Sequence, residues 1–103
     1  MSYRVDFPND SVEKKFEKVL LKISPPNLQD KIMDAIETLA HNPRPFGEKP
    51  FKRLNPPVEC YRFTARYRIR ISSYRVLYDD VDDKNRIVWI MALKKRDERT
   101  YKR

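Results

Sequence analysis

The clearest hydrophobic pattern in the chain runs from Tyr67 to Tyr78, where the sequence reads YRIRISSYRVLY. Apolar residues and arginines alternate on both sides of Ser72-Ser73, which is typical of two strands joined by a tight turn. With the two serines as the turn, Arg70 lies opposite Arg75. One face of this hairpin then carries the apolar and aromatic side chains Tyr67, Ile69, Ile71, Tyr74, Val76 and Tyr78. The other face carries Arg68, Arg70 and Arg75, with Leu77.

The pairing of Arg70 with Arg75 has two interpretations. Like charges directly opposite each other destabilise a sheet, so a scaffold gains nothing from this pair. The first interpretation is a solvated basic face, relieved by Asp79 or Asp80. The second is an anion-binding site on the exposed face of the sheet. The turn itself departs from the usual pattern, since two-residue hairpin turns favour Asn-Gly or a leading glycine.

Helical periodicity precedes this hairpin. Apolar residues at helical spacing predict a first helix over residues 10–23, and Asp10 with Glu13 resembles a capping box at its start. The apolar positions of this helix are Val12, Phe16, Val19, Leu20 and Ile23. A second helix follows Ser24-Pro25-Pro26 and stops at Asn42-Pro43. Its apolar stripe comprises Leu28, Ile32, Ala35, Ile36, Leu39 and Ala40. The short break favours an antiparallel helical hairpin.

The remaining patterns predict strands and loops. Alternation over residues 3–7 predicts a first strand. The proline-rich segment 43–58 reads as a connecting loop, with residues 51–54 as a short edge strand. Unbroken alternation over residues 61–71 predicts one long strand that contains a bend or bulge. Residues 86–93 are apolar on both parities, which is typical of a strand in the middle of a sheet.

The acidic run Asp79 to Asn85 is expected to be a solvated polar turn, because it lacks the glycine and terminal glutamate of a calcium loop. The tail 94–103 is basic and reads as a short helical turn or coil. The resulting order, β-α-α-β-β-β-β, predicts an α+β fold in a single domain over residues 1–103. We expect a twisted, mainly antiparallel sheet with the helical hairpin packed on one face.

The charge is strongly uneven along the chain. The 103 residues carry a formal net charge of +8. Residues 1–60 hold 10 Lys/Arg against 9 Asp/Glu, whereas residues 61–103 hold 13 against 6. The C-terminal half therefore carries nearly all of the excess charge, which favours a polyanion or an acidic protein as the partner.

Several function classes are excluded by composition. A single cysteine, Cys60, rules out an intramolecular disulfide and fits a reducing, cytoplasmic location. One histidine, His41, and one cysteine cannot build a zinc site without several carboxylates. Gly47 is the only glycine, so there is no Gly-rich phosphate loop. No apolar run is long enough for a membrane helix, and no signal peptide is seen. We therefore predict no metal and no cofactor.

These features together resemble the RelE/ParE superfamily of toxins from type II toxin–antitoxin pairs, over essentially the whole chain. Residues 67–78 match the family signature "YRiRiGdYRvlY", and Lys52-Arg53-Leu54 resembles its "kkL" strand. Lys95-Arg96 with Tyr101 resembles the "hR…Y" ending. Three departures stand out: Ser72-Ser73 replaces the usual Gly-Asp, Lys95 replaces a frequent histidine, and residues 56–66 form a longer segment than in compact members.

The resemblance to the RelE branch implies cleavage of messenger RNA in the ribosomal A site. In that reaction a 2′-hydroxyl attacks the adjacent phosphate, which gives a cyclic phosphate and a 5′-hydroxyl. By the same resemblance, the phosphate-stabilising residues are Arg75 and Arg96, since guanidinium binds phosphate in a bidentate way. Tyr101 would stack on a base or aid proton transfer, and Lys95 or Lys94 would take part in proton transfer. The residues expected to hold the RNA are Arg68, Arg70, Lys94 and Arg99.

The expected partners are an acidic antitoxin, the ribosome and its mRNA. The alternative is a ParE-like inhibitor of DNA gyrase without nuclease activity, because a shared fold does not decide between the two. A degenerate member that binds only an antitoxin is a third, weaker hypothesis.

Overall fold

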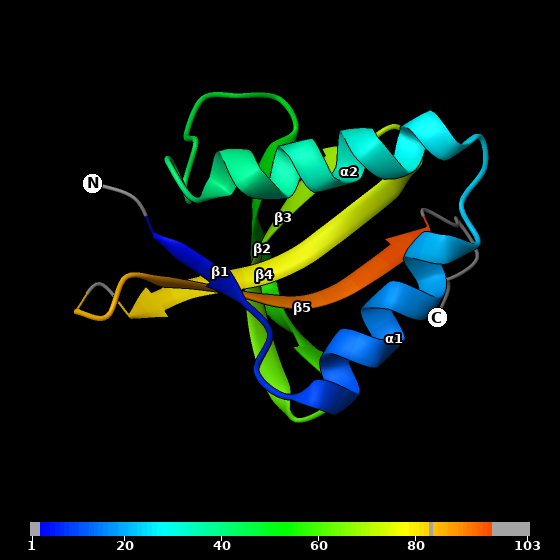
Figure 1. Cartoon of the computed structure of the whole chain (residues 1–103). Coiled ribbons are helices and arrows are strands. Elements are labelled where there is room, and N and C mark those ends of the chain that lie inside the picture. Colours follow the sequence, from blue (N-terminus) through cyan, green and yellow to red (C-terminus); the bar gives the residue numbers. More distant parts are fainter. Residues whose placement is uncertain (1–2, 83, 96–103) are drawn as a thin grey trace.

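The computed structural model describes residues 3–82 and 84–95, which form a two-layer α+β fold (Figure 1). The order of elements is the predicted β-α-α-β-β-β-β. The elements are β1 (Arg4–Asp6), α1 (Asp10–Leu21), α2 (Pro26–Leu39), β2 (Phe51–Cys60), β3 (Phe63–Ile71), β4 (Tyr74–Asp82) and β5 (Ile87–Lys95). They build a sheet in the order β1-β5-β4-β3-β2. Only the β1–β5 pair is parallel among the described pairings, so the sheet is mainly antiparallel, as predicted.

Both helices begin close to where the sequence placed them, but the cap of α1 differs. Asn9 is the N-cap, and its side chain accepts a hydrogen bond of 2.9 Å from the backbone N–H of Val12. The predicted capping by Asp10 is wrong by one residue. Asp10 instead lies in the first turn, where its negative charge favours the positive end of the helix dipole. α2 begins at Pro26, whose missing N–H is no loss in the first turn.

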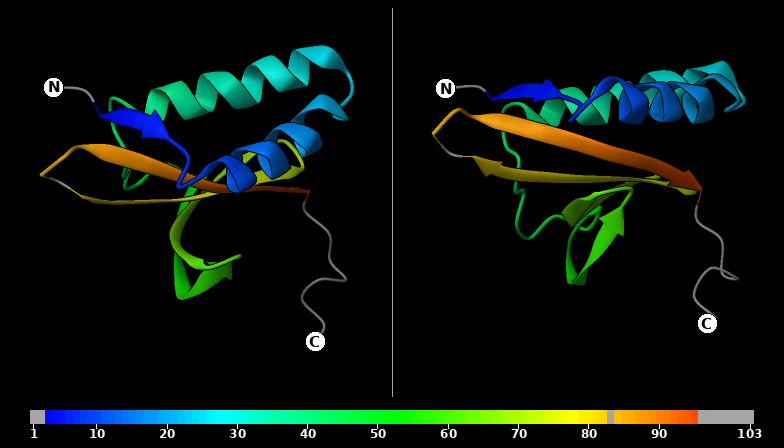
Figure 2. Two further views of the ribbon diagram at one scale, coloured as in Figure 1. Left: turned by 60° about the horizontal axis from the view of Figure 1, so that its bottom comes forward. Right: turned by 90° about the horizontal axis from the view of Figure 1, so that it is seen from below.

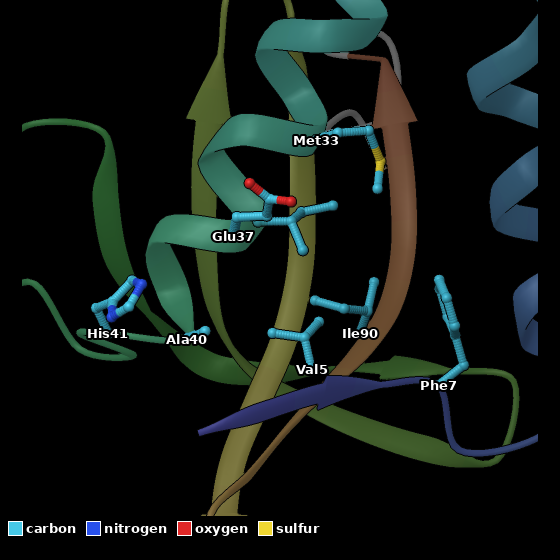
Figure 3. A pocket seen from close by; sticks show the side chains of 8 residues that line it. Val5, Phe7, Met33, Glu37, Ala40, His41 and Ile90 are labelled. Atoms are coloured by element: carbon cyan, nitrogen blue, oxygen red, sulfur yellow. The ribbon is translucent and has the colours of Figure 1, made fainter. Parts of the chain in front are cut away.

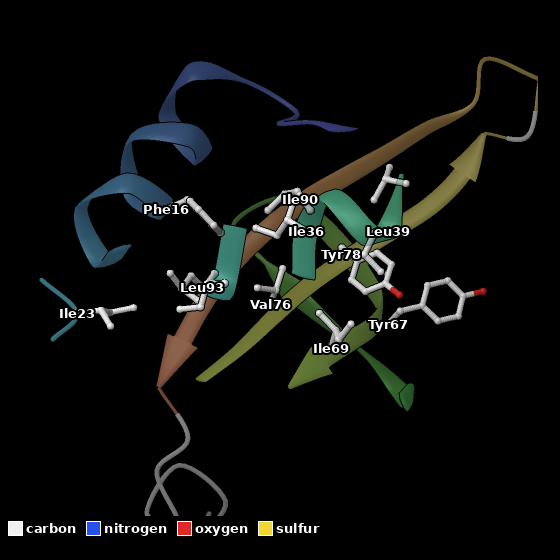
Figure 4. Packing of buried hydrophobic residues seen from close by; sticks show 12 residues of the cluster. Phe16, Ile23, Ile36, Leu39, Tyr67, Ile69, Val76, Tyr78, Ile90 and Leu93 are labelled. Carbon is white, nitrogen blue, oxygen red and sulfur yellow. The ribbon is translucent and has the colours of Figure 1, made fainter. Parts of the chain in front are cut away.

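The two helices cover the same face of the sheet, yet they diverge from each other (Figure 1). α1 contacts β5, whereas α2 contacts β3 and β1. Each helix therefore packs its apolar stripe on the sheet rather than on the other helix. The buried members of the resulting core come from both helices, the connection between them, and the strands β3, β4 and β5 (Figure 4). Its buried members are Phe16, Ile23, Ile32, Ile36, Leu39, Tyr67, Ile69, Val76, Tyr78, Val88, Ile90 and Leu93.

Tyr78 lies at the centre of this core on the middle strand and is completely buried. Its hydroxyl donates a hydrogen bond of 2.6 Å to the carbonyl oxygen of Pro43. The ring lies 5.7 Å from that of Tyr67, measured between centroids. A buried hydroxyl needs such a partner. Tyr78 therefore ties the proline-rich segment after α2 to the sheet.

The structure corrects the prediction for residues 43–58. From Phe51 onward this segment is strand β2, which pairs with β3 up to Cys60. Residues 54–57 lie opposite a single β3 residue, Arg66, so they form a bulge. Pro56 and Pro57 are tolerated because β2 is an edge strand, where missing N–H donors break no ladder. The irregularity expected inside residues 61–71 thus lies in β2, and Tyr61 with Arg62 forms the turn before β3.

The β2–β3 hairpin curls away from the helices and under the sheet (Figure 2). A second apolar cluster fills this space, with Cys60, Ala65, Leu77, Met91 and Ala92 as its buried members. β5 is therefore covered on both faces, as its apolar pattern predicted.

The acidic run after Tyr78 was predicted as a solvated turn, and the structure corrects this. β4 continues through it as far as Asp82, and Asp79 is only 4% exposed.

Candidate nucleic-acid interface

The hairpin of β3 and β4 has the predicted register. Arg70 lies opposite Arg75, and Ile69 lies opposite Val76. Ser72 supplies the turn with a φ of 57°, a left-handed conformation that glycine usually takes. The serine pair therefore closes the hairpin without the glycine of the family signature.

The pairing of β4 with β5 extends the arginine pair into a row. Lys94 lies opposite Arg75, so Arg70, Arg75 and Lys94 cross three strands in line. Lys52 and Arg68 lie opposite each other in the neighbouring row, two residues along β3. Successive rows on one face are about 6.6 Å apart. We call these five side chains the basic row. They lie on the sheet face away from the helices, because the residues that alternate with them along the strands belong to the helix-side core.

A groove of about 480 Å³ lies along the basic row. One wall of the groove is formed by the β2 bulge and its neighbours, namely Leu54, Asn55, Pro56 and Val58. Its basic lining comprises Lys52, Arg68, Arg70 and Arg75. The Nη1 atom of Arg68 donates a hydrogen bond of 2.9 Å to the carbonyl of Pro50, which orients its guanidinium. Arg70 is exposed, whereas Arg75 is half-buried and so less accessible than its position on an outer face suggested.

No carboxylate among the described residues lines this groove. The first interpretation of the arginine pair had relied on Asp79 or Asp80 to relieve it. The Oδ2 atom of Asp79 instead lies 3.6 Å from the Nη1 atom of Arg66. This ion pair lies farther along the strands than the basic row, at the position where Asp79 is opposite Trp89 on β5. The concentrated positive charge in the groove thus favours anion binding.

Cys60 lies at the end of β2 in the second apolar cluster. Burial raises the pKa of the Cys60 thiol above its ordinary value, while the charge of Lys94 partly counteracts this and Glu59 adds to it. A thiol with a raised pKa stays protonated at neutral pH. Cys60 is therefore a packing residue and no nucleophile beside the basic row.

The structure separates the two lysines proposed for proton transfer. Lys94 belongs to the basic row, whereas Lys95 lies opposite Tyr74, whose ring packs against the helix-side core. Both lysines are exposed. The other predicted site residues, Arg96, Arg99 and Tyr101, lie outside the described residues. Sequence reasoning gave Lys52 no role, although its KRL strand was singled out.

His41 lies on the other side of the sheet. It follows α2 at the rim of an apolar groove of about 460 Å³ between that helix, β1 and β5 (Figure 3). The groove is lined by Val5, Phe7, Met33, Ile36, Glu37, Ala40, His41 and Ile90. The only histidine is therefore separated from the basic row by the sheet. Within the described ranges, no group of three or more His, Cys, Asp or Glu residues could hold a metal ion. Neither described helix has the length and hydropathy that a membrane span requires.

Comparisons with known proteins agree on one fold. A chain from the crystal structure of the archaeal RelE–RelB complex of Pyrococcus horikoshii OT3 is 25% identical with a TM-score of 0.66, over 93% of this chain and 97% of that chain. A chain from the toxin–antitoxin complex RelBE2 of Mycobacterium tuberculosis is 23% identical with a TM-score of 0.59, over 93% and 100%. An arginine double mutant of Escherichia coli toxin RelE in the free state is 16% identical with a TM-score of 0.53, over 95% and 87%. The last two similarities establish the fold alone. A search of curated protein sequences finds no match.

The fold thus defines a RelE-like α+β protein, with a basic groove on the sheet face away from its helices. A family model described as the ParE toxin of the type II toxin-antitoxin system, parDE, matches residues 9–100. The chain therefore belongs to the RelE/ParE superfamily of type II toxins, and the resemblance seen in the sequence is confirmed.

Proposed function

We propose that this toxin is a ribosome-dependent mRNA endoribonuclease whose groove binds the phosphate that is cleaved. The observation that carries the proposal is the basic row, in which Arg70, Arg75 and Lys94 stand in register and Lys52, Arg68, Arg70 and Arg75 line one groove. Such a row is unfavourable for the sheet by itself and favourable once a polyanion lies over it.

The reaction that the row supports is an intramolecular phosphoryl transfer within RNA. The 2′-oxygen attacks phosphorus, the bond from phosphorus to the 5′-oxygen breaks, and the products are a cyclic phosphate and a 5′-hydroxyl. Negative charge on the phosphoryl oxygens is greatest in the pentacoordinate transition state. The half-buried Arg75 can offer a bidentate guanidinium there, and Arg70 and Lys94 flank it. Arg68, held by Pro50, is placed to bind the neighbouring backbone.

The reaction also needs a group that takes the proton of the 2′-hydroxyl and one that protonates the leaving oxygen. Lys94 is the candidate within the basic row, and we retain Lys95, Arg96 and Tyr101 as proposed contributors by resemblance. Arg99 is proposed to bind RNA on the same grounds. His41 takes no part, because the sheet separates it from the row.

The test has two parts. Induction of the toxin in cells, followed by mapping of transcript 5′ ends, is expected to reveal new 5′-hydroxyl ends within reading frames. Purified toxin is expected to cleave mRNA in the A site of programmed ribosomes in a single-turnover assay. Intact ribosome-bound mRNA in that assay would refute the nuclease assignment.

A gyrase inhibitor is the second candidate function. It is favoured by the match to the ParE family model over residues 9–100 and by the position of the only histidine on the far side of the sheet. The same purified toxin is to be tested for inhibition of DNA supercoiling by gyrase. Inhibition at stoichiometric toxin, together with intact mRNA, would establish this candidate in place of the first.

We also propose that an acidic antitoxin neutralises this chain, because two similar structures are toxin–antitoxin complexes and residues 61–103 hold 13 cations against 6 acids. An acidic segment over exposed cations is screened by salt. The affinity measured by calorimetry is therefore expected to fall several-fold between 50 mM and 500 mM salt, because the Debye length decreases from about 14 Å to about 4 Å over this range. An affinity independent of salt would contradict an electrostatic contact and point to an apolar one.

A further inference from the structure

Helix α1 carries a second concentration of positive charge. Lys14, Lys15, Lys18 and Lys22 are all exposed. At about 100° per residue, these four lysines and Ser11 fall within an arc of roughly 100° around the helix axis. The acids of α1 occupy the adjoining arc, and they are Asp10, Glu13 and Glu17. The charges of this helix are thus sorted onto separate sides.

The lysines of this stripe repel one another along the helix. Lys14, Lys18 and Lys22 are spaced four residues apart, and like charges at that spacing destabilise a helix. None of the four lysines makes an ion pair within 4 Å among the residues that the structure describes. The helix dipole favours Lys18 in the last turn and Lys22 at the C-cap, but it does not account for Lys14 and Lys15, which lie nearer the middle of the helix.

The turn between β2 and β3 extends the stripe. The ammonium nitrogen of Lys15 lies 5.3 Å from the centroid of the Tyr61 ring, a cation–π contact that fixes the turn beside α1. Tyr61 is nevertheless 54% exposed, and Arg62 next to it is exposed. A hollow of about 430 Å³, lined by Ser11, Lys14, Lys15 and Lys18, lies along the stripe. The surface thus combines five cations, an exposed aromatic ring and a hollow lined by Ser11 and three lysine side chains.

We propose that this α1 lysine surface, formed by Lys14, Lys15, Lys18 and Lys22 with Tyr61 and Arg62, binds the phosphate backbone of folded RNA. It is distinct from the basic row, since α1 packs on the opposite face of the sheet. The inference rests on the proposed function, because a toxin that acts on the ribosome must dock on folded RNA as well as on the strand that it cleaves.

The chemistry of the surface favours RNA over an acidic peptide. A rise of about 1.5 Å per residue places Lys14, Lys18 and Lys22 about 6 Å apart, close to the spacing of successive phosphates along an RNA strand. Lysines act as point charges that follow a phosphate backbone without reading its sequence. An amphipathic peptide would need a series of apolar anchors, and Leu21 at the edge of the stripe is one exposed apolar residue.

The test compares two variants with the same loss of charge. The stripe variant is Lys14→Gln with Lys15→Gln and Lys18→Gln, and glutamine maintains the helix. The control variant is Lys31→Gln with Lys49→Gln and Lys84→Gln, three exposed lysines outside the stripe. Binding to purified ribosomes and to a 20-base-pair RNA duplex is measured at several salt concentrations. The stripe variant is expected to bind about tenfold more weakly or worse, with the slope of log K against log salt reduced by roughly 2 to 3. The control variant is expected to stay within about threefold of wild type.

Equal losses in the two variants would overturn the proposal, because only net charge would then matter. The proposal also falls if the stripe variant loses affinity for the acidic antitoxin and keeps its affinity for RNA. Failure of the proposed function has a different signature: the wild-type toxin then leaves mRNA intact, while the stripe variant still binds the RNA duplex more weakly than the control.

Discussion

Replacing Arg75 by alanine is expected to lower the single-turnover rate of A-site mRNA cleavage about a hundredfold or more, since loss of one transition-state contact commonly has an effect of this size. Arg75 is the middle member of its row, with Arg70 on one side and Lys94 on the other. It is also half-buried in the groove, where water screens its charge less than at an open surface. The measurement is the cleavage rate on programmed ribosomes, with toxin in excess.

Two further variants separate charge, geometry and folding. Arg75→Lys keeps the charge and loses the planar fork, so it is expected to restore only part of the rate. Arg53→Ala is the matched control, because Arg53 is an exposed arginine on β2 that pairs with Tyr67, a residue of the helix-side core. Circular dichroism monitors folding in each case. A wild-type rate for Arg75→Ala would exclude Arg75 from the reaction.

The hairpin was predictable because its two faces differ so strongly. A register shift of one residue would bury Arg68, Arg70 and Arg75 beneath the helices, and no turn preference could offset that penalty. The predicted Arg70–Arg75 pair therefore occurs despite the unusual serine turn, and Ile69 lies opposite Val76 in the same register. The same reasoning explains why β5 was recognised as a covered strand: its apolar residues on both parities meet one core above and another below.

The features that sequence reasoning missed depend on contacts between distant residues. Two adjacent prolines locally favour a loop, and only pairing with β3 makes residues 51–60 an edge strand with a bulge. Asp79 stands in a run that reads as a solvated turn, yet Arg66 from the neighbouring strand lies beside it. These two errors bear on the site, because the bulge forms one wall of the basic groove and Asp79 lies outside it.

Sequence reasoning could not choose between Lys94 and Lys95 for the same reason. The segment between β4 and β5 leaves the register of the two strands open, and the pairing shifts between Leu77 and Tyr78. With that shift, Lys94 aligns with Arg75 and Lys95 aligns with Tyr74. The arginines of the site could thus be predicted from a local pattern, whereas the position of Lys94 opposite Arg75 depends on an irregularity in the pairing of β4 with β5.

The largest effect on stability is expected at Tyr78, which connects the central strand, the helices and the segment after α2. Tyr78→Ala is expected to lower the free energy of unfolding by about 3–5 kcal/mol, as removal of a large buried ring does. A small domain has a total of only about 5–15 kcal/mol, so this variant should be close to unfolded at 37 °C. The measurement is urea unfolding followed by circular dichroism.

Tyr78→Phe separates the ring from its hydroxyl. It keeps the packing against Tyr67 and leaves the buried carbonyl of Pro43 without its 2.6 Å hydrogen bond, which is expected to lower the free energy of unfolding by about 1–3 kcal/mol. Leu21→Ala is the control, because Leu21 is 73% exposed on α1 and its loss opens no cavity. It is expected to change stability by less than about 0.5 kcal/mol. If Tyr78→Phe were as stable as wild type, the hydroxyl would not anchor Pro43, and the ring alone would join the segment after α2 to the sheet.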